Sequence, residues 1–175
     1  TYTLEDSYGS KAVVAGAGFL LNNEMGDFNL IPGRTDVTGR IGTPPNVIAP
    51  RKRMLSSMTP TVILKDGKAR IVTGSPGGRT IPNTTLWVVL NLLEFGLDPI
   101  KAVQAPRTHH QWFPDVLLLE GDSWPESTRS ALTAMGHEWR KVGHLGTANT
   151  IVVDDAGRIH GVPDMRRSTS RALGD

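Results

Sequence analysis

A pair of strands joined through a glycine-rich segment to an apolar helix is the feature that most constrains the fold. Residues 60–64 and 69–72 are rich in apolar and β-branched side chains, and the Asp66-Gly67 pair between them is typical of a hairpin turn. Residues 74–78 read Gly-Ser-Pro-Gly-Gly, and residues 86–95 then carry apolar side chains at roughly helical spacing. The sequence therefore predicts a hairpin, a tight turn and a helix in direct succession.

Short strands and helices are expected along the rest of the chain as well. The predicted strands are residues 1–4, 12–15, 18–21, 116–119, 147–153 and 158–161, and the further predicted helices are residues 99–105 and 125–135. Ser123 or Asp122 is expected to cap the last of these helices. Because strands come first, helices next and strands last, the order predicts an α+β domain. We expect an antiparallel or mixed sheet with helices on a face, and not a βαβ alternation.

The composition is that of a globular domain and excludes several classes of protein. A length of 175 residues suits one domain with a full core, and 38% hydrophobic residues argue against extended disorder. The 19 basic and 17 acidic residues give a net charge of +2, and the longest basic run is Arg51-Lys52-Arg53, which argues against a nucleic-acid-binding domain. The absence of Cys excludes disulfides, thiolate metal sites and a cysteine nucleophile. No apolar stretch reaches the roughly 18 residues that a membrane span requires.

The first residue of the chain is Thr1 and not Met, in an alternation typical of a strand. We expect this start to reflect cleavage, truncation or earlier residues that are missing. A free N-terminal threonine can use its own α-amine as the base and its hydroxyl as the nucleophile. Cleavage before Thr1 would therefore make this residue a candidate nucleophile.

The glycine-rich segment between the hairpin and the helix is a candidate anion site. Gly77 and Gly78 leave two unshielded backbone N–H groups at a helix start, which can bind a phosphate, a carboxylate or a developing oxyanion. The spacing fits neither a Walker loop nor a dinucleotide fingerprint, so phosphate is not favoured. A tight turn without any ligand is the alternative.

Two acids and two serines are further candidates for binding. Glu24 and Asp27 follow an apolar stretch, and they could hold an ammonium group, a metal ion or only solvent. Without a nearby histidine a zinc site is not expected. Ser56 and Ser57 could bind a ligand carboxylate or merely cap local backbone. No nucleophile-elbow sequence surrounds either serine, which argues against a serine hydrolase triad.

The histidine pair and the tryptophans favour structural roles. His109 and His110 are adjacent, and neighbouring side chains on an extended chain point to opposite faces, so one ion cannot easily bind both. We expect a structural role at the edge of the core for this pair. Packing roles are expected for the four tryptophans, which are Trp87, Trp112, Trp124 and Trp139.

Taken together, these segments resemble the small subunit of γ-glutamyltranspeptidase, an N-terminal-nucleophile hydrolase. The resemblance covers nearly the whole chain, and its Leu-Ser-Ser-Met and Gly-Ser-Pro-Gly-Gly motifs are highly specific in this order and spacing. The segments that carry it are residues 1–4, 18–28, 52–60, 73–78, 105–107, 109–112 and 161–167.

The resemblance implies an enzyme made from a precursor that cuts itself into a large and a small subunit. The N-terminal threonine of the small subunit attacks a γ-glutamyl amide, usually glutathione, and water or the amine of an amino acid or peptide then takes the glutamyl group. The implied fold is a four-layer αββα sandwich, of which residues 1–175, as a single domain, supply about half. No cofactor, metal or nucleic acid is implied, and the analogy suggests a periplasmic or secreted protein.

Five residues match the family's binding site for the glutamyl donor. Glu24 and Asp27 match the acidic pair that binds the α-ammonium group, and Ser56 and Ser57 match the hydroxyls that hold the α-carboxylate. This charge pattern suits an α-amino acid, which needs anions on one side and hydrogen-bond donors on the other. Glu5 occupies a substrate-contact position where some members carry Asn. The large subunit is expected to add an Arg to the donor carboxylate.

Three residues match the family's catalytic groups. Gly77 and Gly78 correspond to the oxyanion-hole glycines, and Thr3 corresponds to a threonine that hydrogen-bonds the nucleophile. The Thr-Thr-His-type motif that begins the family's small subunit is absent, so Thr1 aligns with a strand residue. We therefore expect the true nucleophile upstream of this chain.

A second departure from the family lies in the loop of residues 31–50. Some bacterial members place a Tyr from this loop over the pocket, and the matching position here is Thr38, which predicts a more open gate.

The competing functions are an acylase of the same fold, of the cephalosporin acylase or capsule transpeptidase type, and a non-catalytic fragment.

Overall fold

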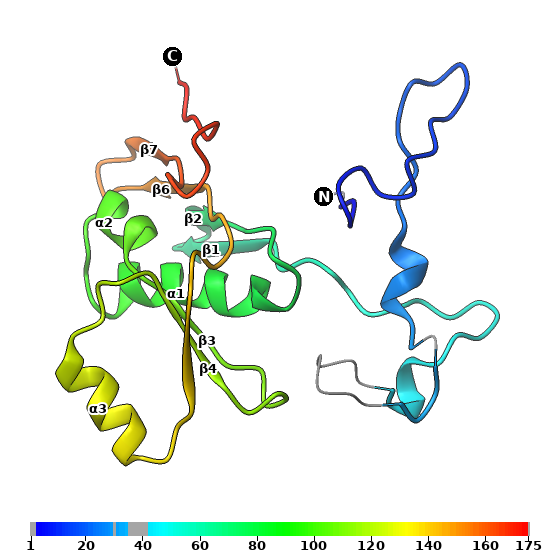
Figure 1. Ribbon diagram of the computed structural model, residues 1–175. Helices are drawn as coiled ribbons and strands as arrows, with labels where there is room; N and C mark the ends of the chain where they lie inside the picture. The colour runs from blue at the N-terminus through cyan, green and yellow to red at the C-terminus, as the bar shows by residue number, and fades with distance from the viewer. Residues whose placement is uncertain (1–2, 30, 35–41, 175) are drawn as a thin grey trace. The chain divides into compact units, whose positions relative to one another are not determined.

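The computed structural model describes residues 3–29, 31–34 and 42–174 of the chain (Figure 1). The chain divides into an N-terminal unit, Thr1–Ser57, and a C-terminal unit, Met58–Asp175. The two units differ in character, because nearly all regular secondary structure lies in the second one. None of the described helices is long and apolar enough to cross a membrane.

A four-stranded antiparallel sheet forms the centre of the C-terminal unit. Its strands are β1 (Thr61–Lys65), β2 (Lys68–Thr73), β6 (Thr150–Val153) and β7 (Ile159–Val162), in the order β1-β2-β6-β7. The predicted hairpin is confirmed, with Thr61 opposite Thr73 and a register irregularity between Ile63 and Leu64. Strand β6, from the far end of the chain, pairs with β2 and so joins the closing hairpin to the first one.

Two helices pack against one face of this sheet. The helix predicted directly after the glycine-rich segment is confirmed as α1 (Ile81–Leu93), and α2 (Pro99–Gln104) follows it, with the Asp98 carboxylate accepting hydrogen bonds from the first turn. The core cluster joins Val88 of α1 and Val103 of α2 to Ala148 and Val162. Figure 1 shows both helices on the same side of the sheet, so the predicted layer of helices on one face is confirmed.

A second, three-stranded sheet extends the C-terminal unit. It consists of β3 (Thr108–His109), β4 (Leu117–Glu120) and β5 (Trp139–Val142), with α3 (Glu126–Ala134) between the last two. Strands β4 and β5 run parallel, so β4, α3 and β5 form one βαβ unit that the predicted element order excluded. The predicted cap of α3 is also wrong, because the N-cap is Pro125 and no side chain caps the helix. Asp122 instead pairs with Lys141.

The N-terminal unit consists mostly of loops and turns. Its regular pieces are two 3-10 helices, η1 (Glu24–Asp27) and η2 (Pro44–Asn46). The predicted strands at residues 12–15 and 18–21 are reduced to one isolated bridge, between Val13 and Leu20. Of the strand predicted at residues 1–4, Thr3 and Leu4 are described and neither lies in a strand. Apolar alternation is insufficient here because a strand also needs a neighbouring strand for its backbone hydrogen bonds.

The face of the four-stranded sheet away from the helices is apolar. Val62, Val72 and Ile151 lie opposite one another on β1, β2 and β6, and all three are exposed. Strand alternation places these side chains on the other face from the buried Ile71 and Val152. No described helix or strand of the C-terminal unit covers this row, which we call the apolar sheet row.

Candidate active site

Three carboxylates of the N-terminal unit converge on one small volume. Glu24 and Asp27 stand at the two ends of η1, where a single tight turn brings them together. One carboxylate oxygen from each of Glu5, Glu24 and Asp27 lies within 4.8 Å of the others. The backbone N–H of Glu5 donates to Asn23 Oδ1 at 2.9 Å, which ties the first acid to the start of η1. We call these three residues the acid cluster.

A serine from the far end of the unit completes this arrangement. The Ser57 hydroxyl donates to Glu24 Oε2 at 2.6 Å across 33 residues of chain. Glu24 is 5% exposed and Ser57 is half-buried, whereas the neighbouring Ser56 is exposed. The structure thus brings together four of the five residues matched to the donor site, and it places Ser56 next to them in sequence. Thr3 is half-buried two residues before Glu5.

Two carboxylate oxygens of the acid cluster are buried without a hydrogen-bond donor among the described residues. Glu24 Oε1 and Asp27 Oδ2 are buried and have no hydrogen-bond partner in the described part of the chain. Burial, the Glu24 carboxyl and the negative charges of Glu5 and Glu24 together raise the pKa of Asp27 to about 7, and the Ser57 hydroxyl offsets only part of this. Buried carboxylates without hydrogen-bond donors favour binding of a cation, either a metal ion or an ammonium group that supplies its own N–H donors.

The chemistry of the cluster restricts which cation could bind. All three groups offer oxygen atoms, and histidine and cysteine are absent from the set. Oxygen-only sites suit hard cations such as Ca²⁺ or Mg²⁺, or an ammonium group, and not zinc. The expectation that this protein needs no metal stays a prediction.

Asn46 is a residue of this site that the sequence does not reveal. Its side-chain amide donates to the Asp27 carbonyl at 2.6 Å, and Asn46 itself is buried. This hydrogen bond fixes the last residue of η1 to η2, although the two residues are 19 positions apart in the chain. The only local signal is an asparagine directly after Pro44-Pro45, which by itself indicates a turn.

The glycine-rich segment leads from β2 to α1 in the C-terminal unit. Gly77 has φ +145° and Gly78 has φ +56°, and both residues are exposed. A Cβ atom on Gly77 would lie 2.6 Å from Thr80 Oγ1, so a side chain there would clash as well as strain the backbone. Among the described residues, neither Gly77 nor Gly78 donates its N–H to another group. The two amides can therefore bind an anion.

The predictions for the histidines and tryptophans are largely confirmed. His109 is buried with its Nε2 3.0 Å from Gln111 Oε1, while His110 faces Asp115, so the two rings have separate structural partners. The indole N–H groups of Trp87, Trp124 and Trp139 donate to nearby oxygens. Trp112 is 70% exposed, so it lies outside the core and packs only against the neighbouring Phe113 ring among the described aromatic residues. The nucleophile candidate Thr1 and the gate position Thr38 lie outside the described residues.

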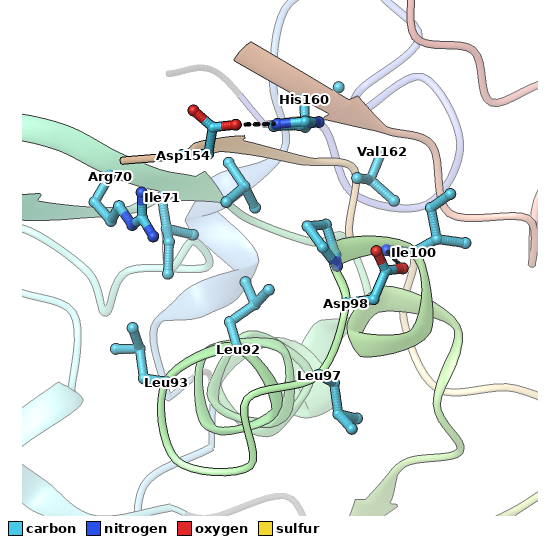
Figure 2. A pocket seen from close by; sticks show the side chains of 13 residues that line it. Arg70, Ile71, Leu92, Leu93, Leu97, Asp98, Ile100, Asp154, His160 and Val162 are labelled. Carbon is cyan, nitrogen blue, oxygen red and sulfur yellow. Dashed lines mark hydrogen bonds and ion pairs between the residues drawn. The ribbon is translucent and has the colours of Figure 1, made fainter. Parts of the chain in front are cut away.

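A cavity of about 390 Å³ in the C-terminal unit is separate from the glycine pair. It lies between the ends of α1 and α2 and strands β6 and β7, with Leu92 and Leu97 among its apolar lining residues (Figure 2). Asp154 and His160 lie at its edge, with Asp154 Oδ2 3.1 Å from His160 Nε2. Hydrogen bonds from His160 and Arg158 lower the pKa of Asp154. No residue matched to the family's site lines this cavity.

Comparison with known proteins defines the class to which this fold and these groups belong. The family described as Gamma-glutamyltranspeptidase matches residues 1–174. A glutathione hydrolase proenzyme of Escherichia coli is 43% identical over 166 residues, which cover 95% of this chain. The crystal structure of a variant of Helicobacter pylori γ-glutamyltranspeptidase superposes with a TM-score of 0.85 at 42% identity, covering 95% of this chain and 91% of that one.

These matches place the fold among the N-terminal-nucleophile hydrolases. The chain belongs to the γ-glutamyltranspeptidase family. It spans 28% of the length of the Escherichia coli proenzyme, as expected for one subunit of a processed precursor. A cephalosporin acylase from Bacillus halodurans is more distant, with 26% identity and a TM-score of 0.76 over 95% of this chain and 30% of that one.

Proposed function

We propose that this chain belongs to an enzyme that transfers or hydrolyses the γ-glutamyl group of glutathione and related γ-glutamyl amides. The observation that carries the proposal is the acid cluster with Ser57 bound to Glu24. An amino acid head group carries one ammonium and one carboxylate side by side, and the cluster offers anions next to the Ser57 hydroxyl. Family membership agrees with this assignment.

The acid cluster would bind the α-ammonium group of the donor. Glu24 Oε1 and Asp27 Oδ2 are the buried acceptors without partners, and an ammonium group would supply N–H donors to both. Glu5 adds a third negative charge at the same place. The Ser56 hydroxyl would hold the α-carboxylate on the other side, together with an Arg from the large subunit and with the Ser57 hydroxyl once it turns from Glu24 to the ligand.

The reaction would proceed through an ester on a threonine upstream of this chain. The threonine hydroxyl attacks the γ-carbonyl carbon while its own α-amine takes the proton. The C–N bond of the amide then breaks, and the proton passes to the departing amine. Water or an acceptor amine attacks the ester in the same manner and frees the threonine. Thr3 would hydrogen-bond the nucleophile and keep it in position.

The paired glycine amides would stabilise the tetrahedral intermediates of both steps. Each attack turns the carbonyl oxygen into an oxyanion. Two preorganised N–H donors stabilise this oxyanion more than they stabilise the neutral carbonyl oxygen of the ground state. Gly77 and Gly78 supply such donors, since their amides are unpaired among the described residues and no side chain shields them.

The large subunit of the same precursor is the proposed partner. We propose residues 1–175 as a single functional domain that becomes complete only against this subunit, after the precursor cuts itself. The apolar sheet row supports the proposal, because exposed valine and isoleucine side chains on a sheet face normally pack against a second layer. A periplasmic or secreted location is proposed by analogy with the family alone.

The donor site can be tested in the processed two-subunit protein with a chromogenic γ-glutamyl anilide. Asp27→Asn removes one of the two unpartnered acceptors and should lower kcat/KM at least a hundredfold, because a charge-assisted bond of about 3 kcal/mol is lost. Asp66→Asn, in the β1–β2 turn, is the matched control and should leave kcat/KM unchanged.

The same assay separates this function from that of an acylase. A glutaryl anilide has the same side chain without the α-amine, and the acid cluster should reject it. Faster turnover of the glutaryl than of the γ-glutamyl anilide would favour an acylase. Failure of the wild-type protein to release the chromophore from either compound would contradict both functions.

A further inference from the structure

We propose that the Ser75 hydroxyl orients the Gly77 amide, and that residues 145–148 hold this hydroxyl in place. The proposal rests on the proposed function, in which Gly77 donates to the oxyanion. Ser75 and Gly146 are positioning residues in this view, and neither contacts the substrate. No motif in the sequence points to residues 145–148.

The hydroxyl of Ser75 is fixed on both sides. It accepts the Thr147 backbone N–H at 2.8 Å and donates to the Pro76 carbonyl at 2.6 Å. The Pro76 carbonyl and the Gly77 N–H belong to the same peptide group, which is planar and points them in opposite directions. The hydrogen bond from Ser75 therefore sets the direction of the Gly77 N–H. It also polarises the peptide and makes that N–H a stronger donor.

Close packing keeps residues 145–148 against the glycine-rich segment. Gly146 has φ +65°, and a Cβ atom on it would lie 2.5 Å from Ser75 Oγ and 2.6 Å from Thr84 Oγ1. The Gly146 Cα atom in turn lies 3.4 Å from the position of a Cβ on Gly77. Any side chain at residue 146 would displace the Ser75 hydroxyl, so the segment can approach this closely only because residue 146 is a glycine.

Buried ion pairs anchor both ends of residues 145–148. Glu120 accepts the Leu145 N–H at 2.7 Å, and Asp164 accepts the Ala148 N–H at 2.7 Å. Arg107 donates to the Leu145 carbonyl at 2.7 Å and to Asp164 at 2.8 Å, and both charged side chains are at most 1% exposed. Arg166 joins the two acids, with its Nε 2.6 Å from Glu120 and its Nη1 3.2 Å from Asp164.

Electrostatics keep this anchor charged. Burial alone would raise the pKa of Glu120, but the hydrogen bonds from Arg166 and from the Leu145 N–H outweigh it and lower the pKa. The hydrogen bonds that Asp164 accepts likewise outweigh its burial. Both acids therefore remain ionised near neutral pH, and the position of the Thr147 N–H between them is fixed by charge-assisted hydrogen bonds.

The experiment compares Ser75→Ala with wild type in the processed two-subunit protein. We expect kcat for the γ-glutamyl anilide to fall roughly tenfold to a hundredfold with KM nearly unchanged, since only the oxyanion contact is weakened. The boronic acid analogue of glutamate forms a tetrahedral, negatively charged adduct, and its Ki should rise in proportion to the loss of kcat. The Ki of L-glutamate, which forms no oxyanion, should stay within about twofold of wild type.

Two further pairs of variants keep the test specific. Ser75→Cys retains a weak donor and should give an intermediate kcat. Gly146→Ala leaves the hydroxyl in the sequence but displaces it, and should reproduce the Ser75→Ala pattern. Gly143→Ala, where a Cβ would meet nothing within 4 Å, and Ser123→Ala, an exposed serine, are the controls and should match wild type.

The outcomes separate this proposal from the proposed function. If the wild-type protein hydrolyses the anilide but Ser75→Ala and Gly146→Ala keep its kcat, the positioning role is wrong and the function stands. Equal losses of affinity for the boronate and for L-glutamate would show general damage to the site and would also contradict the positioning role. If wild type itself is inactive on γ-glutamyl donors, the proposed function fails.

Discussion

Asp27 carries a proton near neutral pH because it is buried beside two other acids. Its pKa is raised from 3.8 to about 7, and an ammonium group would bind the ionised form. In our proposal kcat/KM for the donor therefore rises with pH until Asp27 is ionised. Glu5→Gln removes one neighbouring negative charge, which should lower the pKa of Asp27 and move the rise in kcat/KM to lower pH. Profiles of kcat/KM from pH 5 to 9 check this, with Asp66→Asn as control; an unmoved profile would contradict the coupling.

The protonation of Asp27 affects stability and activity in opposite directions as pH rises. The folded state keeps a proton on Asp27 that the unfolded chain releases above pH 3.8. Folded protein thus binds more protons between pH 3.8 and about 7, so this group's contribution to the free energy of unfolding falls as pH rises through that window. Glu5→Gln should narrow the window and make the protein more stable than wild type at pH 8, measured by thermal unfolding.

Individual residues differ in how far sequence reveals their role. Glu24 and Asp27 stand three positions apart, so local spacing alone predicts that their carboxylates meet. Ser57 joins them from 33 residues away, and only the resemblance to a known family predicted that it shares one site with the two acids. Asn46 was missed because its contact is also remote and its acceptor is a backbone carbonyl, which has no sequence signature.

Secondary-structure elements were predictable where their hydrogen bonds are local. The β1–β2 hairpin and α2 follow from turn residues and apolar spacing close to the observed bounds. Strand β5 was missed because Arg140 and Lys141 interrupt its apolar pattern and its partner β4 lies across a helix. Long-range pairing, and not local preference, decides such elements.

Two glycines, one in the β1–β2 turn and one between β2 and α1, allow the effect of backbone strain alone to be compared with that of strain and a steric clash together. Gly67 and Gly77 both have positive φ, but a Cβ meets nothing within 4 Å at Gly67 and meets Thr80 Oγ1 at 2.6 Å on Gly77. Gly67→Ala should cost about 1–2 kcal/mol of stability and leave kcat unchanged. Gly77→Ala should lower kcat by about a hundredfold or more, because the turn must open and its amide moves. Equal kcat values for the two variants would contradict a role of Gly77 in catalysis.

At the scale of the whole molecule, the described helices of the C-terminal unit cover one face of the four-stranded sheet and leave the other without a layer of helices. Val62, Val72 and Ile151 form a continuous apolar row on the other face, at a position where a layered domain requires a second layer. The chain also spans 28% of the length of its Escherichia coli relative, and in our proposal the rest of a corresponding precursor supplies that layer. The apolar sheet row therefore links the fold of this chain to its proposed partner.

A charge at the centre of the apolar sheet row should separate the two subunits. In the full precursor, Val72→Asp would bury an unpaired carboxylate against the large subunit, at a cost of several kcal/mol. We expect the subunits to lose co-purification through a tag on the large subunit, and activity on the γ-glutamyl anilide to fall with it. Met135→Asp, an exposed apolar residue after α3, is the control and should leave the complex intact. A Val72→Asp precursor whose subunits still co-purify at wild-type yield would mean that this face has no part in the association.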